Sequence, residues 1–136
     1  MENETLIRRR ITIAQRRLAA ARLLCDYGFI NDVLSKSYYA IFAAAKAILA
    51  SKDLNSKKHA GVVELFNLHF IKPGLIDKRF SKILIEAKQA RELSDYGDFY
   101  ETDEQECQVQ LQNAAQFIEM AMNFLRAQGL DFTSTS

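Results

Sequence analysis

Apolar residues recur at helical spacing along four long stretches of the chain, and this repeat constrains the fold more than any other feature. Side chains spaced alternately by about four and three residues lie on one side of a helix, so each stretch predicts an amphipathic helix. The stretches cover residues 4–26, 31–51, 77–95 and 103–128. The 136 residues include one proline and five glycines, too few turn formers for a strand-rich fold. An all-α fold is therefore expected.

The stretch 31–51 is apolar on nearly every face, which is typical of a helix at the centre of a bundle. Its main stripe consists of Leu34, Tyr38, Ile41, Ala45 and Ile48. A shorter helix is predicted over 57–71, with Ser56 as its N-cap and Pro73 just beyond its end. These patterns predict one domain over residues 1–136, an antiparallel bundle of four long helices plus one short helix.

The ends of the last helix carry recognisable signals. Thr102 and Gln105 have the spacing of a capping box at its start. Gly129 follows its last apolar position, and glycine commonly ends helices. We expect residues 129–136 to form a flexible tail, since chain ends without periodic apolar residues are rarely held in place.

Charge is balanced overall but unevenly distributed. The net charge is +1, yet residues 1–22 carry six arginines and residues 92–106 carry seven acidic side chains. One interpretation is that these are two solvated faces that offset each other, within the chain or across a subunit boundary. The other is that the arginine face meets phosphates or an acidic partner.

Several kinds of site are not indicated. Cys25 and Cys107 both fall on apolar stripes, which favours buried thiols over a disulfide or a metal site. No Glu-x-x-His pair or glycine-rich phosphate loop is present. No apolar run approaches the roughly 20 residues of a membrane span, and the N-terminus lacks the apolar core of a signal peptide. We expect a cytoplasmic protein with no membrane segment, metal or cofactor.

Two positions are candidates for anion binding. Lys57, Lys58 and His59 lie at the start of the predicted short helix, where cations oppose the helix dipole unless an anion is bound. Arg91 stands eleven residues after the apolar Phe80. Eleven residues are almost a whole number of turns, so Arg91 is expected to point toward the bundle interior. A buried guanidinium needs a partner: Asp95, an acid on another helix, or a ligand phosphate.

Three stretches resemble the HEPN family of small all-helical proteins. They are "SKSYYAIFAAAKAIL" (35–49), "SKKHAGVVELFNLHFIKPG" (56–74) and "ARELSDYGD" (90–98). The resemblance implies a helical bundle that pairs as a homodimer and is often encoded beside a minimal nucleotidyltransferase. It also implies a possible metal-independent ribonuclease site, in which an arginine is followed after four to six residues by a histidine.

Arg91 matches the arginine of that motif, followed by the polar Glu92, Ser94 and Asp95. Tyr96 stands where the histidine would be expected. A tyrosine is a poor general base at neutral pH because its pKa is near 10, but it can stack on a base or bind phosphate. The resemblance also makes Tyr96 and Tyr100 candidate positions for nucleotide addition by a partner enzyme.

The sequence leaves three functions open. The one it favours is a homodimeric RNA- or nucleotide-binding component of a toxin–antitoxin or nucleotidyltransferase-linked system, because the motif histidine is replaced. The second is an active metal-independent endoribonuclease toxin that uses Arg91 and Tyr96. The third is a helical scaffold without enzymatic activity, in which the charge asymmetry serves only dimer packing.

Overall fold

The structure is a computed structural model that describes residues 3–96 and 102–132, with Tyr96 described for its backbone only. Its helices are α1 (Glu4–Asp26), α2 (Ile30–Ala50), α3 (His59–Phe66), α4 (Arg79–Tyr96) and α5 (Glu104–Ala127). A π-helical turn, η1 (Asn67–Ile71), continues α3. No strand occurs in the described residues. The predicted all-α fold of four long helices and one short helix is confirmed.

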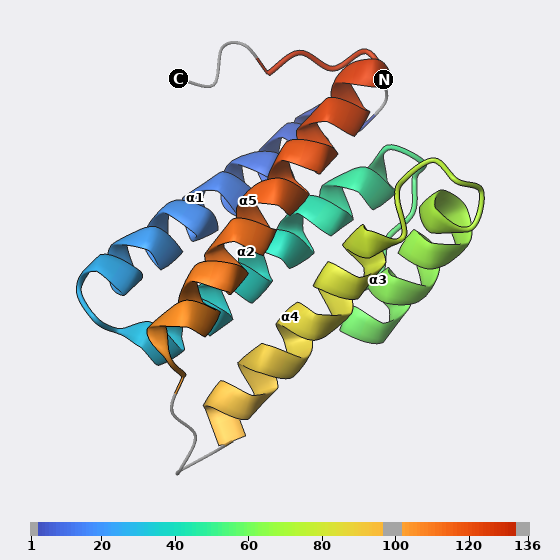
Figure 1. The fold of residues 1–136 in the computed structure, drawn as a ribbon. Helices are drawn as coiled ribbons and strands as arrows, with labels where there is room; N and C mark the ends of the chain where they lie inside the picture. The colour runs from blue at the N-terminus through green and yellow to red at the C-terminus, as the bar shows by residue number, and fades with distance from the viewer. Residues whose placement is uncertain (1–2, 97–101, 133–136) are drawn as a thin grey trace.

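The long helices alternate in direction along the chain, so that α1 and α4 run opposite to α2 and α5 (Figure 1). α1 and α5 lie side by side on one side of α2, and α4 crosses its other side with α3 beyond. α2 contacts all four of the other α-helices. Its central position follows from its sequence, since alanines such as Ala40, Ala44 and Ala47 are fully buried and let neighbouring backbones come close.

By length and composition alone, α2 is also the one helix among residues 3–96 and 102–132 that could cross a membrane. However, 72% of its most apolar window is buried inside the protein. A core helix of a soluble bundle has the same properties, and the packing of α2 against its neighbours accounts for its apolar character.

Phenylalanine rings join α3, η1, α4 and α5 in the core. The Phe117 ring on α5 lies 5.8 Å from Phe66 on α3 and 5.9 Å from Phe80 on α4, measured between ring centres. Phe66 and Phe117 are fully buried. Such aromatic contacts bury a large apolar area at preferred geometry, and they fix the position of the pair α3–α4 against the rest of the bundle.

Two of the predicted helix starts are wrong in detail. Thr102 is not the cap of α5, because Asp103 takes that position and accepts a hydrogen bond from the Glu106 N–H at 2.7 Å. The Thr102 N–H is instead held by Asn31 Oδ1 at 3.1 Å. Ser56 is not the cap of α3, which begins at His59 after Lys58 in extended conformation. Several short polar side chains within one turn can serve as the cap of the same helix, so residue spacing alone does not identify the one that does.

The segment after α5 packs on the bundle rather than forming a tail from Gly129 onward. Leu130 and Phe132 are buried, and the guanidinium groups of Arg8 and Arg126 lie over the Phe132 ring at 5.6 and 5.7 Å. Leu130 and Phe132 are too few to form a periodic pattern in the sequence, yet their burial is enough to hold the segment on the bundle. Residues 133–136 lie outside the described part of the chain.

The two cysteines are free thiols in contact with each other, and Cys107 is buried as predicted whereas Cys25 is not. Cys25 in the last turn of α1 is half-buried, and Cys107 in the first turn of α5 is fully buried. Their sulfur atoms are 3.1 Å apart. Burial and the neighbouring Cys25 thiol raise the pKa of Cys107 to about 12. The contact joins helix ends that are far apart in the sequence.

Candidate functional site

The candidate site begins with two consecutive tyrosines on α2. Neighbouring helical residues point about 100° apart, and the two rings, whose centres are 5.1 Å apart, differ in exposure. Tyr38 is 4% exposed and Tyr39 is 39% exposed. One turn farther on, the Phe42 ring stacks on Tyr38 with ring centres 5.7 Å apart. The result is an aromatic surface that starts in the core and ends in solvent.

His59, the first residue of α3, lies against this surface. Its Nδ1 is 3.0 Å from the Tyr38 hydroxyl, and its ring stacks on Phe42 with centres 5.9 Å apart. Burial, and then the positive charge of Lys88, lower the pKa of His59 to about 4, while Glu92 opposes the shift. His59 is therefore neutral at pH 7, with one ring nitrogen able to accept a proton.

Arg91 of α4 lies against the same surface. Its guanidinium carbon lies 5.4 Å from the centre of the Tyr38 ring and 5.0 Å from that of Tyr39, within the range of a cation–π interaction. Its Nε lies 3.3 Å from Asp95 Oδ2. Of the three partners predicted for Arg91, the structure therefore shows Asp95. The side chain is 29% exposed, and Arg91 thus points inward as expected but stops at the boundary between α4 and α2.

Tyr38 connects the two polar groups, since it touches both His59 and Arg91. Burial raises the pKa of Tyr38 to about 12, against the lowering effect of Arg91, so its hydroxyl stays protonated and available for hydrogen bonding. We call this group the Tyr38 cluster. Its members come from α2, α3 and α4 and are Tyr38, Tyr39, Phe42, His59, Lys88, Arg91 and Glu92.

The structure brings together some of the predicted site residues and separates others. Arg91, His59 and Glu92 belong to the cluster, and Asp95 is paired with Arg91. The Ser94 hydroxyl donates to the Arg91 carbonyl at 2.8 Å and so serves the helix end.

Lys57 and Lys58 are exposed beside the cluster, where we find no side-chain hydrogen bond or ion pair for them among the described residues. The Tyr96 side chain and all of Tyr100 lie outside the described residues, and their proposed roles stay predictions.

Because the stretch 31–51 is apolar on nearly every face, its sequence predicts that both Tyr38 and Tyr39 lie in the core, and it assigns no role to Lys88. The signal for Tyr39 is its neighbour, because two adjacent tyrosines on one helix cannot both be buried on the same side. Lys88 forms an ion pair with Glu92 at 3.5 Å, one turn along α4. This pair places a charge of each sign near His59.

Gly61 is a further residue that supports the site. A methyl group at this position would overlap Ser56 Oγ and lie 2.8 Å from Ser56 Cβ. Ser56 Oγ accepts a hydrogen bond from the Lys58 N–H at 3.3 Å, which shapes the turn before His59. Glycine therefore lets this turn close on the first turn of α3.

We expect Gly61→Ala to displace this turn and to lower the free energy of unfolding by about 1–3 kcal/mol, the usual cost of overpacking. Chemical denaturation monitored by circular dichroism measures the change. Adding Ser56→Gly removes the overlapping atoms, so the double variant should recover much of the loss, with Ser56→Gly alone as the control. Equal stability of Gly61→Ala and the wild type would contradict the close packing.

The lowered pKa of His59 predicts a pH dependence of stability. The unfolded chain takes up the proton near the ordinary pKa of 6.5 and the folded chain only near 4, so acid favours unfolding between these values. His59→Gln should therefore lose less thermal stability than the wild type when the pH falls from 7 to 4.5. His69→Gln, a half-buried histidine in η1, is the matched control. Parallel pH profiles for wild type and His59→Gln would contradict this environment.

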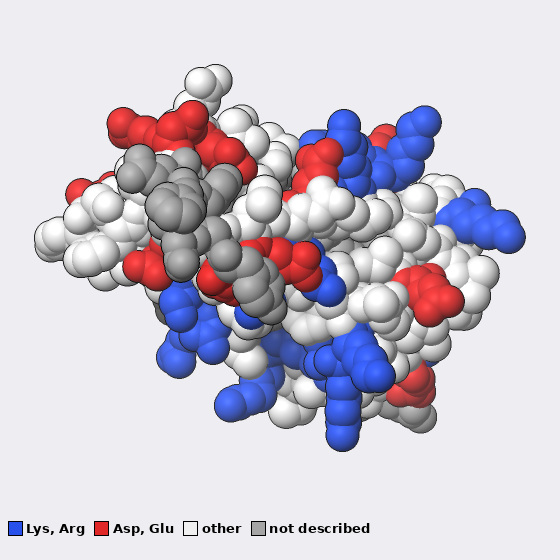
Figure 2. Space-filling model, turned by 90° about the horizontal axis from the view of Figure 1, so that it is seen from below, with Lys and Arg blue, Asp and Glu red and all other residues white. Residues whose placement is uncertain are grey.

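Charges of both signs are interspersed around the lower end of the bundle. Figure 2 shows acidic side chains in several groups across this face, most of them toward its left, and basic side chains in separate groups along the lower margin and at the upper right. Arg9, Arg16, Arg17 and Arg22 are exposed on α1, whereas Arg8 and Arg10 are half-buried and bonded within the chain. Arg8 pairs with Glu4 at 2.8 Å, and Arg10 donates to the Lys46 carbonyl at 2.9 Å. The arginine-rich segment is thus only partly a free basic surface.

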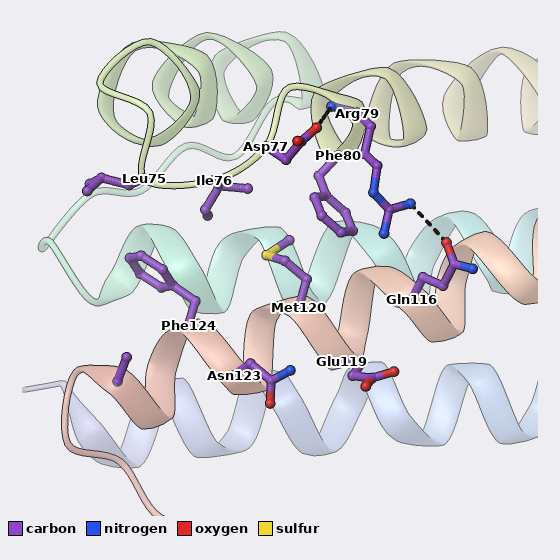
Figure 3. A pocket seen from close by; sticks show the side chains of 11 residues that line it. Leu75, Ile76, Asp77, Arg79, Phe80, Gln116, Glu119, Met120, Asn123 and Phe124 are labelled. Carbon is purple, nitrogen blue, oxygen red and sulfur yellow. Dashed lines mark hydrogen bonds between the residues drawn. The ribbon is translucent and has the colours of Figure 1, made fainter.

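A hollow of about 650 Å³, which we call the Arg79 hollow, lies between the start of α4 and α5, away from the Tyr38 cluster (Figure 3). There Arg79 donates from its side chain to Gln116 Oε1 at 3.0 Å, and its backbone N–H donates to Asp77 Oδ1 at 2.8 Å. Its guanidinium carbon lies 4.2 Å from the Phe80 ring centre. Arg79 is thus held by its own neighbours, and no histidine or tyrosine lines this hollow.

Residues 3–96 and 102–132 contain no group of three or more His, Cys, Asp or Glu side chains that could hold a metal ion. The chemistry open to the Tyr38 cluster itself comes from a neutral imidazole, a guanidinium and an exposed aromatic ring. Such groups suit the recognition of a phosphate and of a base.

Comparison with known proteins places the chain among helical proteins of one family. The model of the HEPN domain matches residues 7–125. A protein of Methanocaldococcus jannaschii named "Putative toxin MJ0605" is 35% identical over 116 residues, which cover 85% of this chain and 86% of the relative. A UPF0332 protein of Gloeobacter violaceus is 37% identical over 113 residues, covering 82% of this chain and 90% of the relative. Another M. jannaschii protein with a toxin name is 30% identical over 112 residues, 82% of this chain and 76% of the relative.

Proposed function

The chain belongs to the HEPN family, and on this premise we propose that it binds single-stranded RNA, or a nucleotide derived from it, through the Tyr38 cluster. The binding would serve a toxin–antitoxin-type system, a role in keeping with the toxin names of two relatives. One observation carries the proposal: a guanidinium and an exposed aromatic ring lie together, 5.0 Å apart, at Arg91 and Tyr39.

Arg91 is suited to hold a phosphate in this position. Its ion pair with Asp95 uses Nε, and neither terminal nitrogen of the guanidinium makes a hydrogen bond within the described part of the chain. Asp95 is 43% exposed, and the buried Arg91 Nε makes no hydrogen bond to it among the described residues, so Asp95 holds the guanidinium only weakly. A phosphate can therefore accept two hydrogen bonds from the planar end of Arg91, the geometry that arginine favours.

Tyr39 is suited to hold a base. Its ring is the exposed end of the aromatic surface, and an unstacked base gains about 1–3 kcal/mol from stacking on an aromatic side chain. The exposed Lys57 and Lys58 at the edge of the cluster add positive charge that attracts the RNA backbone. Single-stranded RNA satisfies both requirements at once, because its bases are free to leave the stack.

Replacement of Tyr39 tests this proposal. Tyr39→Ala is expected to weaken binding of a short single-stranded RNA by about fivefold to a hundredfold, which corresponds to the loss of one stacked base. Fluorescence anisotropy of a labelled RNA at fixed salt measures the affinity. Tyr27→Ala removes another exposed tyrosine, 73% exposed at the end of α1, and should leave the affinity unchanged. Equal losses in both variants, or none in either, would refute a specific role for Tyr39.

The homodimer, the nucleotidyltransferase partner and the cytoplasmic location form part of the same proposal. Light scattering tests the dimer, which predicts twice the mass of one chain. Co-purification with the product of a neighbouring nucleotidyltransferase gene tests the partner, and mass spectrometry tests nucleotide addition at Tyr96 or Tyr100.

A further inference from the structure

We infer that His59, rather than Tyr96, is the proton-transfer group of an RNA-cleaving reaction at the Tyr38 cluster. This inference rests on the proposed binding of RNA at the same place. His59 is supplied by α3 and Arg91 by α4, and both contact Tyr38 of α2. Folding thus places a histidine near the arginine even though none follows it within six residues of the sequence.

The lowered pKa of His59 makes it a weak base, and the feature that suits it to proton transfer is its fixed position. The ring is fixed by stacking on Phe42 and by the 3.0 Å contact between Nδ1 and the Tyr38 hydroxyl. When the Nδ1–H donates to that hydroxyl oxygen, Nε2 carries a free electron pair and can accept a proton. The charged groups that act on the ring are Lys88 and Glu92 of α4, and Arg91 of the same helix lies over the neighbouring Tyr38.

The reaction needs no reagent besides the RNA strand itself. His59 Nε2 takes the proton of a ribose 2′-hydroxyl, whose oxygen attacks the adjacent phosphorus. The new bond from the 2′-oxygen to phosphorus forms as the bond to the 5′-oxygen breaks, and this leaving oxygen receives the proton from His59. The products are a 2′,3′-cyclic phosphate and a 5′-hydroxyl. Arg91 stabilises the extra negative charge on the phosphate oxygens while both bonds are partly formed.

Binding and cleavage are measured separately, so that the two proposals can fail separately. Binding uses a 2′-O-methyl RNA, which has no nucleophilic hydroxyl, and cleavage uses the same sequence with ribose in the presence of EDTA. His59→Gln should still bind the methylated RNA through Arg91 and Tyr39, and at saturating protein it should cleave the ribose strand at least a hundredfold more slowly, since a general base contributes about 10²–10⁴ in rate. His69→Gln should match the wild type in both assays.

A chemical rescue distinguishes proton transfer from a structural role. His59→Ala leaves room beside Phe42, so added imidazole should restore part of the cleavage, whereas it should restore none in His59→Ala/Arg91→Met. Cleavage by His59→Gln at the wild-type rate would overturn the inference. So would a wild-type protein that binds the methylated RNA and leaves the ribose strand intact, an outcome that keeps the binding proposal. If the wild-type protein binds neither RNA, both the binding proposal and the inference about His59 are contradicted.

A separate observation supports a second inference: we propose that Cys25 and Cys107 form an oxidisable pair that reacts with hydroperoxides. The sulfur atoms are already 3.1 Å apart. Cys25 is half-buried and lines an open hollow with Arg22 and Gln108, and the Gln108 amide donates to its sulfur at 3.5 Å. Cys25 is thus the thiol that a small oxidant reaches, and the fully buried Cys107 lies behind it.

The chemistry proceeds in two steps. The Cys25 thiol releases its proton and the thiolate attacks the terminal oxygen of the hydroperoxide. The O–O bond breaks, Cys25 becomes a sulfenic acid, and the departing alkoxide or hydroxide takes up the released proton as an alcohol or water. The Cys107 sulfur then attacks the Cys25 sulfur, the S–O bond breaks, and the leaving hydroxide takes the Cys107 proton as water. Two thiols are oxidised to one disulfide and one hydroperoxide is reduced. The bond would fasten the first turn of α5 to the last turn of α1.

Hydrogen peroxide applied to the full chain tests this pair. The expected result is an intramolecular disulfide between the α1 and α5 peptides in mass spectrometry, together with a higher midpoint of thermal unfolding that reverts on reduction. Cys107→Ser should instead retain a sulfenic acid on Cys25 that dimedone traps. Oxidation of Cys25 beyond the sulfenic acid while Cys107 stays free, or disulfides only between chains, would overturn the proposal.

Discussion

Arg91→Met is expected to lower the affinity for single-stranded RNA about tenfold to a hundredfold while leaving the fold intact. A hydrogen bond to a charged group contributes about 1.5–3 kcal/mol, and methionine can still cover the rings of Tyr38 and Tyr39 with its apolar chain. Anisotropy titration measures the affinity, and thermal unfolding checks the fold. The RNA affinity of Arg91→Lys should lie between those of the wild type and Arg91→Met, because lysine keeps the charge but not the planar guanidinium.

Arg79→Met provides the matched control for this prediction. Arg79 lies on the same helix and also over an aromatic ring, but its side chain donates a hydrogen bond to Gln116 in the Arg79 hollow (Figure 3). The Arg79→Met variant should therefore bind RNA with nearly the affinity of the wild type. If both arginine variants lose affinity equally, binding depends on general positive charge, and if neither does, the helical scaffold becomes the better account of this protein.

Phe117→Ala is expected to have the largest effect on stability, a loss of about 3–5 kcal/mol in the free energy of unfolding. Its ring is fully buried between the phenylalanines of α3 and α4, so truncation leaves a cavity where three helices meet. Urea denaturation followed by circular dichroism measures the loss. Phe29→Ala, which truncates a ring that is 57% exposed, should stay within about 0.5 kcal/mol of wild type. A loss below about 1 kcal/mol for Phe117→Ala would contradict the central place of this ring.

Periodicity predicted the helices because each buries a stripe of its own residues. The stripe Ile7, Ile11, Ala14 and Leu18 is buried as expected, and the boundaries of the long helices agree within two residues. The caps were less predictable because Thr102 and Asp103 are both suitable side chains one residue apart. Burial of Phe132 could not be predicted because it depends on α1 and α5, whose Arg8 and Arg126 lie over its ring.

The candidate site was predicted only in part because its contacts cross between helices. The direction of Arg91 follows from the helical count within α4. The position of His59 against Tyr38 depends instead on how α3 docks on α2, which no spacing in the sequence encodes. The same holds for the contact between Cys25 and Cys107, each of which looked like an ordinary core position on its own helix.

Photo-crosslinking locates the bound RNA and so tests the central claim most directly. A single-stranded RNA that carries 4-thiouridine is bound, irradiated and digested, and the attached peptides are identified by mass spectrometry. The Tyr38 cluster predicts crosslinks in the peptides that contain Tyr39 and His59, lost in Arg91→Met. Crosslinks confined to the exposed arginines of α1, Arg9, Arg16, Arg17 and Arg22, and unchanged in Arg91→Met, would contradict it.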